Sequence, residues 1–148
     1  MTPLIENRKA RRDYAILDTL EAGIVLSGQE VKSLRAKRAN ISEAFVRVLS
    51  NEVFLVNAHI QPLLTVAHVE YEPTQSRKLL LKKKQIKDLE VALHTKGLTA
   101  VPLMIGLQKN YIKVLVGIGK GKKVYERKEE LKKRDLKREE SRELRGKR

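Results

Sequence analysis

The C-terminal fifth of the sequence sets the first limit on how the chain can fold. Residues 119–148 contain 14 Lys and Arg against 7 Asp and Glu, and their sizeable apolar side chains occupy only a few positions (Val124, Tyr125, Leu131, Leu136 and Leu144). So little apolar surface does not offset the entropy that is lost when a segment is ordered against a core. We therefore assign the folded domain to residues 1–118 and expect residues 119–148 to form a basic tail.

The composition of this tail indicates its behaviour. It lacks Pro and consists mainly of good helix formers, and acid-to-base pairs four residues apart, such as Glu129 and Lys133, favour a helix. We expect the tail to be disordered alone and helical against a partner. The alternative is a solvated charged helix that has no partner.

The whole chain is strongly basic, which points to a polyanionic partner. Its 148 residues include 32 Lys and Arg against 18 Asp and Glu, a net charge of +14. Basic residues cluster at 8–12, 32–38, 77–78, 82–84 and 120–123. Only 4% of the residues are aromatic, which argues against extended stacking on single strands. The pattern favours contacts with the phosphates and ribose hydroxyls of a folded RNA.

The lack of cysteine narrows the possible chemistry. It excludes a disulfide scaffold, a thiolate metal site and a thiol nucleophile, and it fits a reducing compartment. No apolar run approaches the roughly 18 residues of a membrane span, and residues 1–12 are charged where a signal peptide would be apolar. We expect a cytoplasmic protein that does not enter a membrane.

Between residues 14 and 118 the apolar pattern is mostly that of short strands. The expected strands are 14–20 and 23–27 on either side of Glu21-Ala22, 44–49 and 53–56 as a hairpin, 77–81, 98–105 and 111–118. In the last strand Ile112, Val114, Val116 and Ile118 share one face. Pro102 suggests an edge position or a bulge in its strand.

Two helices interrupt the strands. Ser27 and Glu30 form a capping-box pattern, which predicts a helix from about residue 30 to residue 39. The second helix is expected over residues 82–94, with Gly97 as its stop. The predicted fold is mainly β, a small antiparallel barrel of the oligonucleotide-binding kind with two or three flanking helices and the basic tail.

No catalytic or metal-binding set of residues stands out. Residues 117–123 (GIGKGKK) lack the spacing and the Ser or Thr of a nucleotide-triphosphatase phosphate loop, and we interpret them as a flexible loop whose lysines approach RNA phosphates. A plain flexible linker is the alternative. The three histidines show no metal-ligand spacing. We expect no enzyme activity, no cofactor and no metal.

Several stretches closely resemble, in order and spacing, a known bacterial family. They are NRKARRDY (7–14), EAGIVLSGQEVKSLRA (21–36), NI (40–41), RKLLL (77–81), GLTAVPL (97–103) and KVLVGIGKGKK (113–123). This pattern resembles small protein B (SmpB), the family of transfer-messenger RNA (SsrA) binding proteins. The resemblance implies an oligonucleotide-binding-like barrel that binds the tRNA-like domain of transfer-messenger RNA. It also implies delivery of that RNA to stalled ribosomes for trans-translation, with the tail in the empty messenger channel and the decoding centre of the small subunit.

The resemblance also implies which residues contact RNA. Carried over by motif they are Asn7, Arg11, Glu21, Leu80, Lys113, Lys120, Lys122 and Lys123, to which the basic clusters add Lys32, Arg35, Arg77 and Lys78. The expected ribosome contacts of the tail are Tyr125, Arg127, Lys128, Lys132, Lys133 and Arg134. For Leu80, packing in the core is an equally good interpretation. The Glu21 carboxylate would accept a hydrogen bond from a guanine edge or a ribose hydroxyl, or it would hold a neighbouring Arg in place.

The sequence departs from the family pattern at two places, so the resemblance does not predict the RNA contacts that the family residues would make there. Gln75 stands where the family usually has Arg, and Gly106-Leu107 stands where it usually has an aromatic pair. We expect a monomer that acts as a ribosome-rescue factor. The rivals are a structural ribosomal protein with a similar basic tail and a nuclease or nucleotide hydrolase.

Overall fold

The structure, a computed structural model, describes residues 1–62 and 70–122. Its helices are α1 (Arg8–Asp13), α2 (Gly28–Arg35) and α3 (Lys83–His94). Its strands are β1 (Thr2–Glu6), β2 (Tyr14–Ile24), β3 (Ala39–Asn40), β4 (Phe45–Leu49), β5 (Glu52–Val56), β6 (His59–Ile60), β7 (Arg77–Leu80), β8 (Leu98–Gln108) and β9 (Tyr111–Gly121). The expected site residues Lys123, Tyr125, Arg127, Lys128, Lys132, Lys133 and Arg134 lie outside the described residues.

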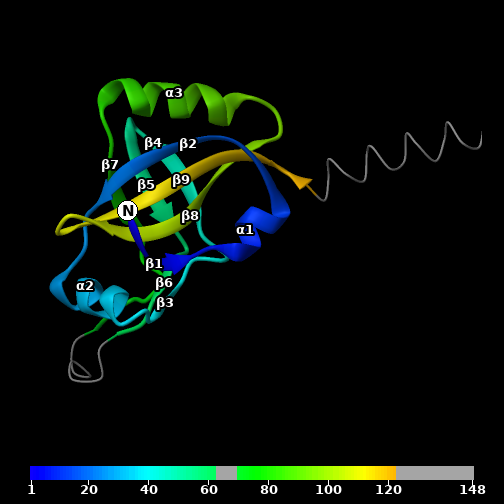
Figure 1. The fold of residues 1–148 in the computed structure, drawn as a ribbon. Coiled ribbons are helices and arrows are strands. Elements are labelled where there is room, and N and C mark those ends of the chain that lie inside the picture. Colours follow the sequence, from blue (N-terminus) through cyan, green and yellow to red (C-terminus); the bar gives the residue numbers. More distant parts are fainter. Residues whose placement is uncertain (63–69, 123–148) are drawn as a thin grey trace, which may run out of the picture.

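The main sheet closes into an antiparallel barrel (Figure 1). Its strand order is β1-β8-β4-β5-β7-β2-β9, and β8 also pairs with β9, which closes the barrel. Strand β8 pairs with β4 at Ala100 and with β1 further along, at Met104–Leu107. The short strands β3 and β6 form a separate pair. In Figure 1, α3 lies above the barrel, α2 lies at the opposite side, and α1 lies near the end of β9. The predicted antiparallel barrel with flanking helices is confirmed.

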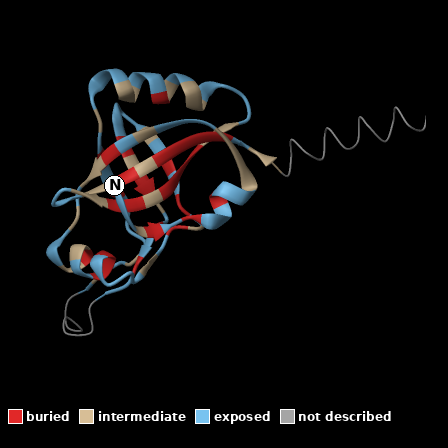
Figure 2. Ribbon diagram, in the orientation of Figure 1, coloured by how far each residue is buried: buried red, intermediate tan, exposed pale blue. Residues whose placement is uncertain are grey.

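The core lies inside this barrel (Figure 2). Both the strands and the flanking helices contribute fully buried aliphatic side chains to the core, for example Leu34 from α2, Leu55 from β5 and Leu89 from α3. The predicted inner face of β9 is confirmed, because Val114 and Val116 are completely buried. With few aromatics available, branched aliphatic residues fill the space, and truncating one of them to Ala is expected to cost about 2–5 kcal/mol.

Strand β2 corrects the sequence-based prediction. Glu21 and Ala22 do not separate two strands; they pair with Leu115 and Val114 in the middle of one continuous strand of 11 residues. Glu, Ala and Gly have low strand preference, so the local sequence looks like a turn. Pairing with β9 on one side and with β7 on the other overrides that preference.

The predicted β4–β5 hairpin is confirmed. Leu49 pairs with Glu52, and Ser50 and Asn51 between them have φ angles of 50° and 62°. Positive φ at both central residues is the backbone geometry whose twist matches that of antiparallel strands. The register of β8 against β9 also shifts between Pro102 and Met104, as the missing amide of Pro102 predicts.

Helix α2 has the predicted N-cap, Ser27, but it begins at Gly28 and ends at Arg35, earlier at both ends than the predicted range of about 30–39. The Ser27 hydroxyl accepts a hydrogen bond from the Glu30 amide, and the Glu30 carboxylate accepts one from the Ser27 amide. Together these two bonds form a complete capping box. The helix stops at Arg35 because Lys37 takes a left-handed φ of 59° and its amide donates back to the Leu34 carbonyl. Helix α3 matches its predicted range within one residue, with Gly97 in the connection that follows.

The glycine-rich stretch before the tail is not a flexible loop, at least as far as Gly121. It is the last part of β9, which runs three residues beyond the expected end of the domain. A Cβ at Gly117 would lie 2.7 Å from the Leu103 side chain, and one at Gly119 would lie 2.5 Å from the Ala15 carbonyl oxygen. These glycines therefore allow close packing of strands.

Candidate nucleic-acid interface

A hollow on the outside of the barrel brings together three of the predicted site residues, Glu21, Leu80 and Lys113. They come from three different strands, β2, β7 and β9. The hollow has a volume of about 470 Å³, and its full lining is Glu21, Gly23, Leu80, Leu81, Lys82, Gln85 and Lys113. The sequence alone does not predict that these three residues lie together, because they are far apart along the chain and only the pairing of β2 with β7 and β9 brings them close.

The register of the sheet explains the hollow. Gly23 pairs with Leu80 on one side and with Lys113 on the other, so a residue without a side chain lies between two that have long ones. A Cβ at this position would lie 3.2 Å from the Leu80 Cβ. Glu21 lies two residues earlier on β2 and points to the same face. Gly23 therefore forms the floor, and the other three side chains form the rim.

Leu80 faces solvent. Its side chain is 52% exposed, whereas its neighbour Leu79 is 2% exposed. Core packing is therefore excluded for Leu80. An exposed aliphatic group beside charged ones suits contact with a sugar or with the face of a base.

The edge of the hollow next to α3 adds polar groups that the prediction of site residues omitted. The Lys82 amide donates to the Gln85 side-chain oxygen at 2.9 Å, which fixes Gln85 at the start of α3. Among residues 1–62 and 70–122, none of the ion pairs involves Glu21, Lys82 or Lys113. The hollow therefore offers two ammonium groups for phosphates and one carboxylate that accepts hydrogen bonds. Lys82 belongs to a basic cluster visible in the sequence, whereas nothing there marks Gly23 or Gln85.

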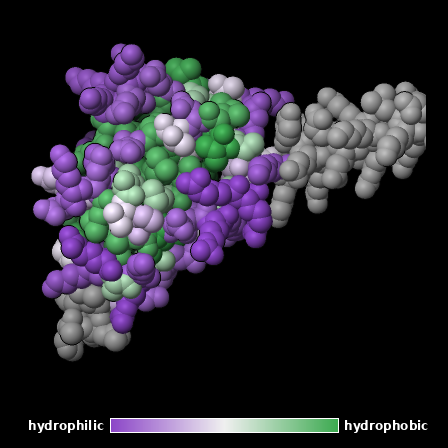
Figure 3. All heavy atoms as spheres, viewed as in Figure 1, coloured by the Kyte–Doolittle hydropathy of each residue, from purple (hydrophilic) through white to green (hydrophobic). Residues whose placement is uncertain are grey.

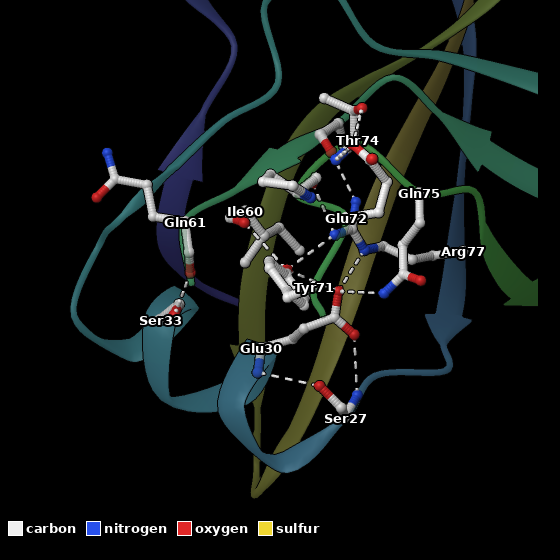
Figure 4. Close-up of polar contacts among 12 residues, drawn as sticks. Ser27, Glu30, Ser33, Ile60, Gln61, Tyr71, Glu72, Thr74, Gln75 and Arg77 are labelled. Atoms are coloured by element: carbon white, nitrogen blue, oxygen red, sulfur yellow. Dashed lines mark hydrogen bonds and ion pairs between the residues drawn. The ribbon is translucent and has the colours of Figure 1, made fainter. Parts of the chain in front are cut away.

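Arg77, a predicted RNA contact, is instead a buried structural group (Figure 4). Its Nε donates to Glu30 Oε2 at 2.6 Å and its Nη1 donates to the Ala58 carbonyl at 2.6 Å. Its Nη2 donates to the Pro73 carbonyl at 2.9 Å and to the Tyr71 hydroxyl at 3.1 Å. With 3% exposure and every nitrogen in use, Arg77 has no group left for RNA.

Glu30 is the acidic centre of this network. Burial alone raises the pKa of its carboxyl, but the hydrogen bond from the Ser27 amide and the charge and hydrogen bond of Arg77 outweigh burial, so the pKa lies below 4.5. Burial and the neighbouring carboxylate raise the pKa of the Tyr71 hydroxyl. Gln75 also reaches Glu30, at 3.5 Å, so the residue that departs from the family pattern belongs to this network.

Asn7 is also structural in its position. Its side chain is 2% exposed, donates to the carbonyls of Ile41 at 2.9 Å and Pro102 at 2.8 Å, and accepts from the Ala10 amide at 3.0 Å. It caps α1, a helix that sequence periodicity missed because Ala10 is its one buried residue. Asn7 therefore positions α1, which carries the exposed Arg11.

The remaining predicted residues are spread around the surface. Lys32 and Arg35 are exposed on α2 and do not line the hollow, and Lys78 is exposed on β7, with its Nζ 3.4 Å from Glu52. Lys120 is exposed near the end of β9 and Lys122 is half-buried. Figure 3 shows hydrophilic residues over α3 and α1 with an apolar band across the strands between them.

The described residues show no feature of a metal site or a membrane span. Within residues 1–62 and 70–122, His, Asp and Glu side chains do not gather in threes around a possible metal position. Over the same residues, no helix has the length and apolar character needed to cross a membrane.

Comparison with known proteins gives one consistent answer. The family model "SmpB protein" matches residues 4–146. The SsrA-binding protein of Enterococcus hirae is 46% identical over 143 residues, 97% of this chain and 93% of the relative, and that of Sulfurovum sp. is 52% identical over 136 residues, 90% and 89%. A solved structure described as "tmRNA-SmpB: a journey to the center of the bacterial ribosome" has a TM-score of 0.68 and 45% identity, covering 79% of this chain and 82% of that one. The chain belongs to the SmpB family.

Proposed function

We propose that the chain binds the tRNA-like domain of transfer-messenger RNA through the hollow and delivers that RNA to stalled ribosomes for trans-translation. The observation that carries the proposal is the convergence of Glu21, Leu80 and Lys113 on one exposed hollow. Membership of the SmpB family and the names of the relatives support it. The neighbour whose description names transfer-messenger RNA, SmpB and the ribosome supports both partners.

Each group in the hollow has a task that its chemistry suits. Lys82 and Lys113 neutralise phosphates, and Leu80 packs on a sugar or base. Glu21 accepts a hydrogen bond from a guanine amino group or a 2′-hydroxyl, which gives the site a preference that a purely basic surface lacks. The protein then acts by binding and positioning RNA, as a monomeric cytoplasmic factor without catalytic chemistry.

The buried network fixes the start of β7, the strand that carries Leu80. The Glu30 carboxylate holds Arg77, which is the first residue of β7 and lies three positions before Leu80. The same network anchors Tyr71 and the Pro73 carbonyl in the connection that leads into β7. The tail that follows β9 completes the proposal: on the ribosome it becomes helical and probes the empty messenger channel and the decoding centre.

Competition binding tests the RNA preference. The purified chain is titrated with transfer-messenger RNA, a transfer RNA and an unrelated folded RNA of equal length across a salt series. We expect a preference for the first that persists as salt rises and the nonspecific phosphate contribution falls. Equal binding to all three, lost together with salt, would overturn the proposal and favour a structural ribosomal protein.

The charge of Glu21 makes a sharper test. Glu21→Gln removes a negative charge, so simple electrostatics predicts tighter binding to any RNA. A carboxylate that accepts a specific hydrogen bond predicts weaker binding to transfer-messenger RNA alone. Lys113→Gln is expected to weaken binding and to reduce the salt slope by about one. Lys96→Gln is the matched control, because it makes the same charge change at an exposed position outside the hollow.

A further inference from the structure

One aromatic side chain stands out because it is exposed beside the hollow. Tyr111, the first residue of β9, is 71% exposed, and among the described aromatic residues the next is Phe45, at 40%. The chain has only six aromatic residues, and Tyr111 was not among the predicted RNA contacts. A large exposed ring in a protein with few rings is a candidate for binding rather than packing.

The strand places Tyr111 on the same face as Lys113. Residues two apart on a strand point to the same side, at a spacing of roughly 7 Å. The neighbouring strand continues this surface: beyond Gly23, the Val25 amide donates to the Lys78 carbonyl at 3.0 Å, and the Val25 side chain is 52% exposed. The outer face of β9, β2 and β7 therefore carries an apolar surface next to the hollow.

We propose that Tyr111 is an RNA-binding residue whose ring stacks on an unpaired base next to the nucleotides held by Glu21 and Lys113. This inference rests on the proposed function and extends its binding site along β9. Phosphate recognition requires positive charge and gains nothing from an exposed ring, whereas an unstacked loop base gains a flat apolar surface. The ligand is thus a folded RNA that presents a single-stranded base beside a helix.

A structural role for Tyr111 has to be separated from this one. Tyr111 pairs with Gln108 at the end of the β8–β9 hairpin, and Tyr is a favourable strand residue there. Tyr111→Thr keeps strand preference and removes the ring, whereas Tyr111→Phe keeps the ring and removes the hydroxyl. We expect Tyr111→Phe to bind transfer-messenger RNA like the unchanged chain and Tyr111→Thr to bind about tenfold more weakly.

The salt dependence of binding distinguishes stacking from charge. Stacking releases no counterion, so the Tyr111→Thr variant is expected to keep the salt slope of the unchanged chain while its affinity falls. Lys113→Gln, in contrast, is expected to reduce the slope. Thermal unfolding of both Tyr111 variants establishes that the barrel is intact.

The absence of Trp from the sequence allows a direct readout. Tyr111→Trp introduces a single indole on this face, and Phe45→Trp introduces one on β4, which is not adjacent to β9 in the sheet. We expect RNA binding to quench the fluorescence of Trp at position 111 and to leave that at position 45 unchanged.

Two results would overturn the inference while leaving the proposed function intact. One is selective binding of transfer-messenger RNA by Tyr111→Thr within twofold of the unchanged chain. The other is a Tyr111→Trp variant whose indole fluorescence does not change when RNA binds. Failure of the unchanged chain to prefer transfer-messenger RNA would instead refute the proposed function, and the Tyr111 contact with it.

Discussion

The hollow and the buried network share strand β7 and show opposite uses of similar residues. Along β7 the order is Arg77 inside, Lys78 outside, Leu79 inside and Leu80 outside. A charged residue thus lies in the interior and an apolar one at the surface. The lesson is that alternation along the strand, rather than residue type, decides which side chains can meet RNA.

The difference in partners accounts for the two outcomes. Inside, each of the three guanidinium nitrogens of Arg77 donates at least one hydrogen bond, to Glu30, to the Tyr71 hydroxyl or to a backbone carbonyl, which offsets the cost of burial. Outside, Glu21 and Lys113 form no ion pair among the described residues and remain available to a ligand. Charge serves stability in one region and recognition in the other.

The largest expected effect comes from breaking the buried pair. Arg77→Met leaves the Glu30 carboxylate buried without its main partner, and we expect a loss of about 3–5 kcal/mol in the free energy of unfolding. Lys78→Met, at the next position, breaks only an exposed pair and is expected to cost about 0.2–1 kcal/mol. Urea unfolding measures both. Similar losses in the two variants would contradict the assignment of Arg77 to the interior.

The two neighbouring leucines give the next comparison. Leu79→Ala removes a buried side chain and should cost about 2–5 kcal/mol of stability. Leu80→Ala removes an exposed one, so stability should change by less than about 0.5 kcal/mol. Affinity for transfer-messenger RNA, measured on folded protein, should fall for Leu80→Ala. A stable Leu80→Ala variant with unchanged affinity would remove Leu80 from the interface.

Acid should weaken the buried network through Glu30. Because the pKa of the Glu30 carboxyl is lower in the folded chain than its ordinary value of 4.5, the unfolded chain takes up this proton first as the pH falls. The stabilisation is therefore complete above pH 4.5 and is lost as the pH drops through the folded pKa. Urea unfolding at a series of pH values should show a smaller acid-induced loss for Glu30→Gln, and an unchanged loss would assign it to other carboxylates.

Features of the fold that depend on residues close together in the sequence could be predicted, and features that depend on distant residues could not. The β4–β5 hairpin and the α2 capping box were predicted because residues a few positions apart determine them. The burial of Arg77 was not, because its carboxylate partner is 47 residues away. The continuous strand β2 was missed for a similar reason, since distant strands sustain a segment with weak strand preference.

For the candidate site too, the sequence predicted some features and the structure was needed for the others. Motif resemblance identified Glu21, Leu80 and Lys113, which the fold then brought together. The same resemblance included Asn7, whose amide is fully used inside the fold. A motif records which residues a family retains but does not distinguish a residue that contacts RNA from one that positions a helix. That distinction required burial and hydrogen bonds.

The smallest expected effect tests the floor of the hollow. Gly23→Ala places a methyl group 3.2 Å from the Leu80 Cβ, a tight contact that the exposed Leu80 side chain relieves by a small shift. Gly within a strand is less favourable than Ala by about 0.5–1 kcal/mol, so stability should stay the same or rise slightly. Affinity for transfer-messenger RNA should nevertheless fall about fivefold, or about 1 kcal/mol, because the methyl group occupies space that RNA groups enter. Gly28→Ala is the matched control, since a Cβ at Gly28 meets no atom within 4 Å and Gly28 is not part of the hollow. If Gly23→Ala binds as tightly as Gly28→Ala, the RNA contacts only the rim, and recognition depends on Glu21, Leu80 and Lys113 without close approach to the strand backbone.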